Sequence, residues 1–378
     1  MKKILISLSY YSPHISGLTL SIKHLAQALA NDGYDITILT TQHYKQLPET
    51  EVINKVHVIR VPFLFRLSKG FFMPSFLSKA IQTLQKTDDV MIVQPQVEGL
   101  LLALLAKIMG KKVHCLYICE VSLSGGMGTQ IIAYILRLIN SVTLLFADSV
   151  STLTDDFAKH NVVLQRFAKD VRGIFPIVEF PHIDPTIRQT VEKRLPNTDY
   201  YIGYLGRISA EKGIHYLLEA IPLLQKELGE RFVIVLAGPQ KVVGETAYRQ
   251  QIEELLQTHS KNVFLLGELP DASLGAFYSL LDVFVLPSTN NTEAFGMVQV
   301  EAMSCGTPVV STDLPGVCVP ITQTAMGEIV PPADVPALAK AIIQIVKEKK
   351  KYVKPKELII SIFSPAKTVQ AYKTIFAE

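Results

Sequence analysis

The sequence lacks the features that mark several classes of protein. It has only four cysteines among 378 residues, with no Cys-x-x-Cys pair and no cluster of cysteine and histidine. This pattern argues against a zinc site and favours free thiols in a reducing compartment. No block of lysine and arginine is present, and 37 basic against 34 acidic side chains give a net charge of only +3. We therefore expect no nucleic acid among its partners.

Long uninterrupted apolar runs are also missing. The first residues lack the hydrophobic region and small-residue cleavage site of a signal peptide, and they predict a strand instead. The segment 131–150 approaches the roughly 20 residues that cross a bilayer, but Arg137 and Asn140 interrupt it. Because a charge at the bilayer centre is costly, we expect a buried helix that leads into a strand.

What the sequence does have is a regular alternation of β-branched apolar runs and amphipathic stretches. Such alternation predicts an α/β fold with parallel, doubly wound sheets. The pattern stops after Pro176 in a segment rich in proline and polar residues, which we interpret as a linker, and it restarts at Tyr200. We expect Rossmann-like domains at 1–180 and 196–363, with a ligand cleft at the carboxyl ends of their strands.

The most informative segment is TEAFGMVQVEAMSCGTPVV, residues 292–310. Glu293 and Glu301 are too far apart to share one proton or one metal ion, since eight residues of helix rise about 12 Å. The residues between them, 295–297, are expected to begin a helix whose free N–H groups form an anion pocket suited to phosphate. A pocket for diphosphate with an acid at each end fits a nucleotide sugar, with the ribose at Glu301 and the hexose at Glu293.

A second segment, GRISAEKG at 206–213, follows one predicted strand and opens the next helix. Arg207 and Lys212 can both point at one phosphate, Arg as a bidentate donor and Lys as a point charge. A single charged loop residue is more often solvated, but this pair shares a domain with the glutamate segment. Gly17, between the first strand and the first helix, is a weaker signal, because glycine there can admit a phosphate or simply form a turn.

These segments resemble those of the family-4 retaining glycosyltransferases, which have the two-domain GT-B fold. The resemblance covers nearly the whole chain and is most specific in GRISAEKG, PSTNNTEAFGMVQVEAMSCGTPVV and GEIVPPADVPALAKAI. It implies two facing Rossmann-like domains, with the donor mostly on the second and the acceptor mostly on the first. It also implies a last helix, 364–378, that returns to the first domain. No cofactor and no metal are implied, in agreement with the missing Asp-x-Asp motif.

The resemblance also implies roles for individual residues. Arg207 and Lys212 would bind the donor diphosphate and stabilise the leaving nucleotide. Glu293 would contact the transferred sugar, and Glu301 would hold the ribose. Further donor contacts are implied for the backbone of Phe295, Gly296 and Met297, for the loop that contains Gly267 and Leu269, and for Gly17.

One position departs from the family pattern. Many relatives have a histidine that meets the transferred sugar at the end of a first-domain strand, whereas this chain has Ile118 in LYICEVSLSGG. Since Ile cannot bond a sugar hydroxyl, Glu120 becomes a candidate catalytic residue; the alternative is a carboxylate paired with a Lys or Arg. The departure keeps two other functions open: an idle sugar-nucleotide-binding subunit that supports a partner transferase, and a phosphorylase or epimerase.

The acceptor is indicated only by the segment 62–86, in which phenylalanines alternate with basic residues. This pattern suits an anionic membrane surface or a lipid-linked glycan. The alternative is an ordinary sheet-covering helix, because Phe76, Ala80 and Leu84 have helical spacing. We expect a hexosyltransferase that uses a UDP- or GDP-sugar for polysaccharide or glycolipid synthesis. We place it in the cytoplasm, and at the inner face of the membrane if the segment 62–86 binds an anionic membrane surface.

Overall fold

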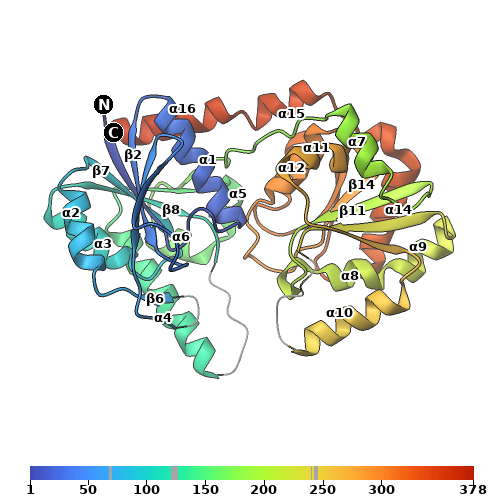
Figure 1. Cartoon of the computed structure of the whole chain (residues 1–378), viewed down its shortest axis with the longest axis horizontal. Coiled ribbons are helices and arrows are strands. Elements are labelled where there is room, and N and C mark those ends of the chain that lie inside the picture. The colour runs from blue at the N-terminus through green and yellow to red at the C-terminus, as the bar shows by residue number, and fades with distance from the viewer. Residues whose placement is uncertain (68–69, 121–126, 240, 242–245) are drawn as a thin grey trace. The chain divides into compact units, whose positions relative to one another are not determined.

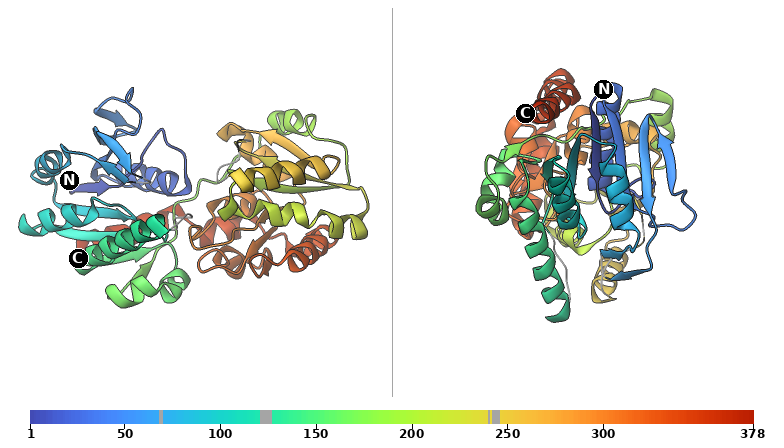
Figure 2. Two further views of the ribbon diagram at one scale, coloured as in Figure 1. Left: turned by 90° about the horizontal axis from the view of Figure 1, so that it is seen from below. Right: turned by 90° about the vertical axis from the view of Figure 1, so that its left-hand side faces the viewer.

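The computed structural model describes residues 1–67, 70–120, 127–239, 241 and 246–378 (Figure 1). The chain divides into two compact units, Met1–Ile177 with Ser364–Glu378, and Val178–Phe363. Each unit contains its own large sheet, and the helical layers can be followed from two further directions in Figure 2.

The sheet of the first unit has the strand order β10-β9-β8-β7-β1-β2-β4-β3. All of its pairs are parallel except β3 with β4, which are antiparallel. Its central strands are buried because they carry β-branched and other apolar residues on both faces. The strands are β1 (Lys3–Ser7), β2 (Asp35–Thr41), β3 (Thr50–Ile53), β4 (Val56–Val61), β7 (Asp89–Gln94), β8 (Lys112–Tyr117), β9 (Ser149–Thr152) and β10 (Arg172–Gly173).

The helices of this unit lie on the two faces of the sheet. Right-handed crossovers put α1, which connects β1 to β2, on one face, and put α2, α3 and α4, whose connections run the other way, on the opposite face. The last helix, α16, packs beside α1 (Figure 1), where Lys373 pairs with Asp32 at 2.7 Å. The helices are α1 (Gly17–Asn31), α2 (Phe76–Leu84), α3 (Gly99–Ile108), α4 (Met127–Leu145), α5 (Asp155–His160), α6 (Val162–Phe167) and α16 (Pro365–Ala377).

The segment 62–86 contains a hairpin as well as a helix. Strands β5 (Phe65–Leu67) and β6 (Gly70–Phe72) pair antiparallel, and the exposed rings of Phe65 and Phe72 stack 5.0 Å apart. Phe71 is buried instead, edge-on to Phe63. Helix α2 buries Phe76, Ala80 and Leu84, so it follows the ordinary pattern of a sheet-covering helix.

Two expectations from the sequence need correction. The segment 131–150 forms most of α4 and then β9, as expected, but α4 is only partly buried, since one side of it faces solvent. No described helix is long and apolar enough to cross a membrane. The segment interpreted as a linker contains helix α7 (Pro185–Glu192), whose first turn is capped by the Asp184 carboxylate. Helix α7 packs against α11 (Asp271–Leu280) in the second unit.

The sheet of the second unit has the order β13-β12-β11-β14-β15-β16, and all of its pairs are parallel. Its strands are β11 (Tyr200–Leu205), β12 (Phe232–Ala237), β13 (Val263–Gly267), β14 (Val283–Leu286), β15 (Val309–Thr312) and β16 (Gly327–Val330). The other elements are η1 (Ala210–Lys212), α8 (Ile214–Glu219), α9 (Ile221–Leu228), α10 (Thr246–Thr258), α12 (Met297–Ser304), α13 (Val319–Thr324), α14 (Val335–Tyr352) and α15 (Lys356–Ile362).

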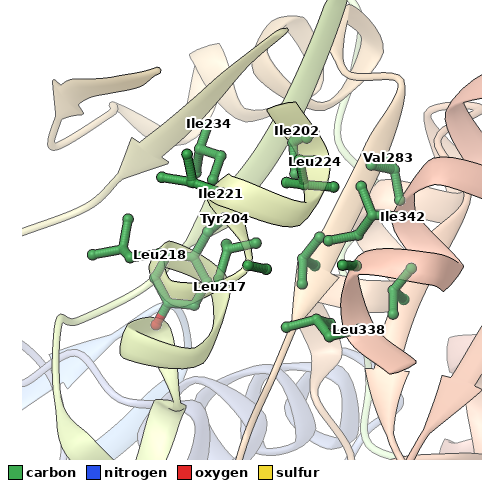
Figure 3. Packing of buried hydrophobic residues seen from close by; sticks show 14 of the residues in the cluster. Ile202, Tyr204, Leu217, Leu218, Ile221, Leu224, Ile234, Val283, Leu338 and Ile342 are labelled. Atoms are coloured by element: carbon green, nitrogen blue, oxygen red, sulfur yellow. The ribbon is translucent and has the colours of Figure 1, made fainter. Parts of the chain in front are cut away.

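The core of the second unit fills the space between β11 and helices α8, α9 and α14. Figure 3 shows Ile202 and Tyr204 of β11 against the leucine and isoleucine side chains of these helices. Burying one large apolar side chain stabilises a fold by about 1.5–3 kcal/mol, so this cluster holds β11 and the loop after it firmly. Tyr204 also reaches beyond its strand, because its hydroxyl donates to the Arg207 carbonyl at 2.8 Å.

The strand order fixes where a ligand of the second unit can bind. The connections from β11 lead toward β12 and β13, whereas those from β14 lead toward β15 and β16. Neighbouring strands with connections in opposite directions form a topological switch point, where ligands of open α/β sheets bind beyond the carboxyl ends. The loops after β11 and β14 are therefore the place to look for a site.

Candidate functional site

The loop after β11 (206–213) and the loop after β14 (287–296) are joined by close backbone packing. Thr289 N–H donates to the Glu211 carbonyl at 3.0 Å. Gly213 has a φ of +66°, and a Cβ atom there would lie 1.9 Å from the Pro287 carbonyl oxygen. Only glycine fits such a position. The consequence is that Lys212, the residue before it, is held beside the second loop.

Lys212 and Glu293 form an ion pair between these loops. Both side chains are more than half buried, so this pair is less screened than a surface salt bridge. Arg207 is more exposed and pairs with Glu211 at 3.6 Å. The structure thus places both predicted cations at the switch point, each with its own carboxylate. A bound polyanion could take over one or both carboxylate partnerships.

Helix α12 begins where the sequence predicts. Gly296, with a φ of +74°, is its N-cap, and no side chain in the described part of the chain caps the helix. The first backbone N–H groups of such a helix have no intrahelical acceptor and carry partial positive charge. Phe295 contributes only its backbone here, because its ring is buried edge-on to Phe363. An anion at this helix end would therefore meet peptide groups and not an aromatic ring.

Glu301 lies one turn further along α12, half-buried, and accepts a hydrogen bond from the Tyr278 hydroxyl at 2.8 Å. Burial raises the pKa of Glu301 to about 7, and the nearby carboxylates of Glu179 and Asp271 act in the same direction. A carboxyl with this pKa exists in both protonation states at neutral pH. It can accept hydrogen bonds from a pair of hydroxyl groups, and in its protonated state it can also donate one.

Three glycines line the carboxyl ends of the neighbouring strands β11, β12 and β13. Gly238 N–H donates to the Gly267 carbonyl at 2.8 Å, and a Cβ on Gly238 would lie 2.5 Å from the Gly206 carbonyl oxygen. Leu269 follows in the loop to α11 and is partly buried. Since β13 and β14 are three strand spacings apart, about 14 Å, the edge from Gly267 to Glu293 is long enough for an extended ligand.

The two candidates in the first unit have local roles of their own. Gly17 is the exposed first residue of α1, behind the N-cap Ser16, and a Cβ atom added to it would meet no other atom within 4 Å. Glu120 accepts a hydrogen bond from the Asn161 side-chain amide at 2.9 Å. Among the described residues no Lys or Arg pairs with it, so the structure does not show the ion pair of the simpler interpretation. Ile118 is buried in the core, and residues 121–126, which follow Glu120, lie outside the described part of the chain.

Sequence reasoning missed Tyr278 and Gly213. Tyr278 approaches Glu301 only through the packing of α11 against α12, and no local sequence pattern predicts this contact. Gly213 does carry a signal, since a glycine directly before a helix often takes a left-handed conformation. The sequence pattern predicts only that Gly213 precedes a helix. The structure adds that Gly213 packs closely against the loop after β14.

Two family models match the chain along most of its length. The glycosyl transferase 4-like domain matches residues 16–172, and the glycosyl transferases group 1 domain matches residues 186–359. The chain belongs to the group 1 glycosyltransferases. The resemblance seen in the sequence is thereby confirmed.

The similarity of this glycosyltransferase to individual proteins is more distant. It is 26% identical over 227 residues to the capsular polysaccharide biosynthesis glycosyltransferase CapM of Staphylococcus aureus, a match that covers 57% of each chain and so little more than half of CapM. It is 23% identical over 358 residues to the phosphatidylinositol N-acetylglucosaminyltransferase GPI3 subunit of Saccharomyces cerevisiae, covering 90% of this chain and 75% of that subunit. Anabaena HepE, solved with UDP-glucose, has a TM-score of 0.75 at 20% identity over the whole of both chains. This likeness confirms the predicted GT-B fold.

Proposed function

We propose that this glycosyltransferase transfers a hexose, with retention of anomeric configuration, from a UDP- or GDP-sugar to a glycan or lipid-linked glycan. The observation that carries the proposal is the Lys212–Glu293 ion pair beside the uncapped first turn of α12. A cation, a carboxylate and free peptide N–H groups at one switch point are the groups that a sugar diphosphate requires.

The diphosphate fits the positive groups of this site. Its oxygens would accept hydrogen bonds from the first N–H groups of α12, with Lys212 and Arg207 beside them. Released from Lys212, the Glu293 carboxylate would accept hydrogen bonds from the hexose hydroxyls. The complex of HepE with UDP-glucose, on the same fold, supports this choice of ligand class.

The nucleoside fits the other end of the site. Glu301 would hold the ribose hydroxyls, with Tyr278 orienting its carboxylate. The base would lie toward Gly267 and Leu269, at the end of β13. These assignments follow the family resemblance, and their support is that Gly267 ends β13 while Glu301 lies on α12, the helix that follows β14 at the switch point.

Transfer then depends on charge at the leaving group. The acceptor hydroxyl would attack C1 from the side of the leaving diphosphate, while the bond from C1 to the diphosphate oxygen breaks. The hydroxyl proton passes to a phosphate oxygen. Arg207, Lys212 and the α12 N-terminus stabilise the negative charge that develops there, which is the part of the barrier that fixed positive groups lower most. On this basis we propose that the chemistry is metal-independent.

The proposed acceptor has fewer observations in its support than the proposed donor. CapM carries a name from capsular polysaccharide biosynthesis, which supports a polysaccharide as the acceptor; the lipid-linked precursor and the peripheral place at the cytoplasmic face of a membrane stay predictions from the sequence. The roles of Gly17 and Glu120 stay predictions. A second candidate function, an idle sugar-nucleotide-binding subunit, is favoured by one observation: the buried Ile118 stands at the position where the resemblance implies a histidine.

Calorimetric titration with UDP- and GDP-sugars tests the donor site, and an assay of released nucleotide with candidate acceptors tests transfer. We expect Glu293→Gln to bind the nucleotide nearly as well as the wild type and to transfer at least about 100-fold more slowly, a typical loss for one transition-state contact. A fully active variant would remove Glu293 from the site. Nucleotide binding by the wild type without release would favour the idle subunit.

A further inference from the structure

Four aromatic rings gather beyond the carboxyl ends of two neighbouring strands in the first unit. Tyr10 and His14 lie in the loop between β1 and α1, and His43 and Tyr44 lie in the loop between β2 and β3. Taken in this order, successive rings have centroids 4.7, 5.7 and 4.7 Å apart. Tyr10 and His43 also approach each other, at 5.7 Å. We call these four residues the Tyr–His cluster.

The Tyr–His cluster is only partly used in the packing of its own unit. The buried Phe71 lies edge-on to Tyr10, with ring centroids 5.2 Å apart. Tyr10, His14 and His43 are half-buried, however, and Tyr44 has 54% of its surface exposed. Each ring of the cluster combines an apolar face with polar atoms at its edge. Aromatic rings beside hydrogen-bonding groups commonly line small-molecule sites, so the cluster suits a ligand that is itself partly apolar and partly polar.

A buried arginine holds the two loops of the cluster together. The side chain of Arg60, on β4, is fully buried and forms an ion pair with Glu51. Its guanidinium also donates to the Ser12 carbonyl at 2.9 Å and to the Pro48 carbonyl at 3.1 Å. Because these carbonyls belong to the two loops that carry the cluster, charge-assisted hydrogen bonds fix the loops before any ligand binds. Such pre-organisation reduces the entropy that binding costs.

The hydrogen bonds of His43 leave one acceptor atom unused. Its Nδ1 lies 3.3 Å from the Thr41 carbonyl oxygen, so we assign the hydrogen of the neutral ring to Nδ1. Nε2 is then an acceptor, and it is buried with no hydrogen-bond partner among the described residues. Burial, with the nearby Arg60 acting in the same direction, lowers the pKa of His43 below its ordinary value of 6.5. The neutral ring therefore suits a hydroxyl donor better than a phosphate.

We propose that the Tyr–His cluster binds one pyranose ring of the acceptor. The face of an aromatic ring is negative, so C–H groups on the apolar face of the sugar would stack on the tyrosine rings. A hydroxyl that enters between the rings would donate to His43 Nε2. The loop after β1 belongs to the switch point of this sheet, because β1 connects toward β2 whereas β7 connects toward β8. The inference rests on the proposed function and deepens it, since the acceptor is then recognised through a saccharide unit.

The competing interpretation is that the rings only pack the two loops against each other. Tyr44 separates the two interpretations, because it is the most exposed member of the cluster. Tyr44→Ala removes a ring on which a sugar can stack, whereas Tyr44→Phe keeps the ring and removes only the hydroxyl. The matched control is Tyr134→Ala, since Tyr134 lies on α4 of the same unit, outside both loops, with 69% of its surface exposed.

Saturation-transfer NMR of the full chain with simple sugars tests the inference without any assay of transfer. The probes are methyl β-D-glucopyranoside and methyl β-D-galactopyranoside, and the control probe is glucitol, which has hydroxyls but no ring. We expect the ring protons of at least one glycoside to receive saturation and those of glucitol to receive none. Tyr44→Ala should bind the glycoside at least about fivefold more weakly, because one stacked contact is lost. Tyr44→Phe should stay within about twofold of the wild type, and Tyr134→Ala should match it.

Three results overturn the inference: no saturation of either glycoside by the wild type, equal saturation of glucitol, or unchanged binding by Tyr44→Ala. A lower thermal unfolding midpoint for Tyr44→Ala than for Tyr134→Ala also overturns it, because Tyr44 would then act in packing. Calorimetric titration with UDP- and GDP-sugars should give the same result for the wild type and Tyr44→Ala, since Lys212 and Glu293 lie in the second unit. Donor binding without glycoside binding therefore contradicts this inference alone, whereas absence of donor binding contradicts the proposed function.

Discussion

Replacing Glu301 with Gln should make the protein more stable at pH 8 than the wild type, although it removes a residue of the proposed donor site. The reason is that burial raises the pKa of Glu301 from 4.5 to about 7. The folded state therefore favours the neutral carboxyl, and ionisation costs more there than in the unfolded chain. Gln resembles the protonated carboxyl in shape and has no charge to bury.

The size of the effect follows from the pKa difference. Each pKa unit corresponds to about 1.4 kcal/mol, so the rise from 4.5 to about 7 corresponds to about 3 kcal/mol. For a raised carboxyl pKa, this stabilisation is fully present below pH 4.5 and is lost as the pH rises through 7. Relative to the Gln variant, wild-type stability should fall across this window, with most of the change between pH 5 and 8.

The assay is urea unfolding of both proteins at pH 5, 6, 7 and 8, followed by circular dichroism. The useful quantity is the difference in unfolding free energy between variant and wild type, because other groups that titrate in this range cancel in the difference. We expect the difference to grow by about 2–3 kcal/mol from pH 5 to 8. A difference that stays flat would show that Glu301 titrates normally, and the account of a desolvated carboxyl beside Tyr278 would be wrong.

Two further pairs of substitutions test the packing that forms the site and the hairpin. Gly213→Ala should destabilise the second unit by at least about 2 kcal/mol and weaken donor binding, because its Cβ would collide with the Pro287 carbonyl. The measurement is thermal unfolding. The control is Gly128→Ala, whose added Cβ would have no described atom within 4 Å. Phe71→Ser should cost about 3 kcal/mol as a buried aromatic, and Phe72→Ser, exposed on the same strand, less than about 1 kcal/mol. Equal midpoints for the two Phe variants in urea unfolding would contradict the assigned burial.

The alternation of apolar and amphipathic segments was sufficient to predict the parallel, doubly wound sheets, and the family resemblance predicted the GT-B fold. The start of α12 was also predictable, because Gly296 stands directly before a helical run. Helix α7 was missed although Asp184-Pro185 is a good N-cap and first-turn pair. The hairpin β5–β6 has strands of three residues, which are too short for an alternating pattern to show.

Side-chain partners in the site depended on tertiary structure. The Tyr278–Glu301 hydrogen bond joins residues 23 apart in sequence through the packing of two helices. The pairing of Arg207 with Glu211 was not predicted from the sequence either, since charge and spacing alone allowed Arg207 to point toward the same phosphate as Lys212. The sequence therefore predicted which segments form the candidate site, an assignment that stays a prediction, whereas the partners within it needed coordinates.

Strand order explains why the predicted residues of the second unit converge. Arg207, Lys212 and Glu293 lie in the two loops at its switch point, between β11 and β14. The first sheet has a switch point of the same kind between β1 and β7, because β1 connects toward β2 and β7 connects toward β8. Gly17 follows the loop after β1, and Glu120 follows β8, the strand next to β7. The weaker first-unit candidates thus belong to the edge where that sheet, by the same rule, is expected to bind a ligand. Mutagenesis for the acceptor should therefore start with the loops after β1, β7 and β8.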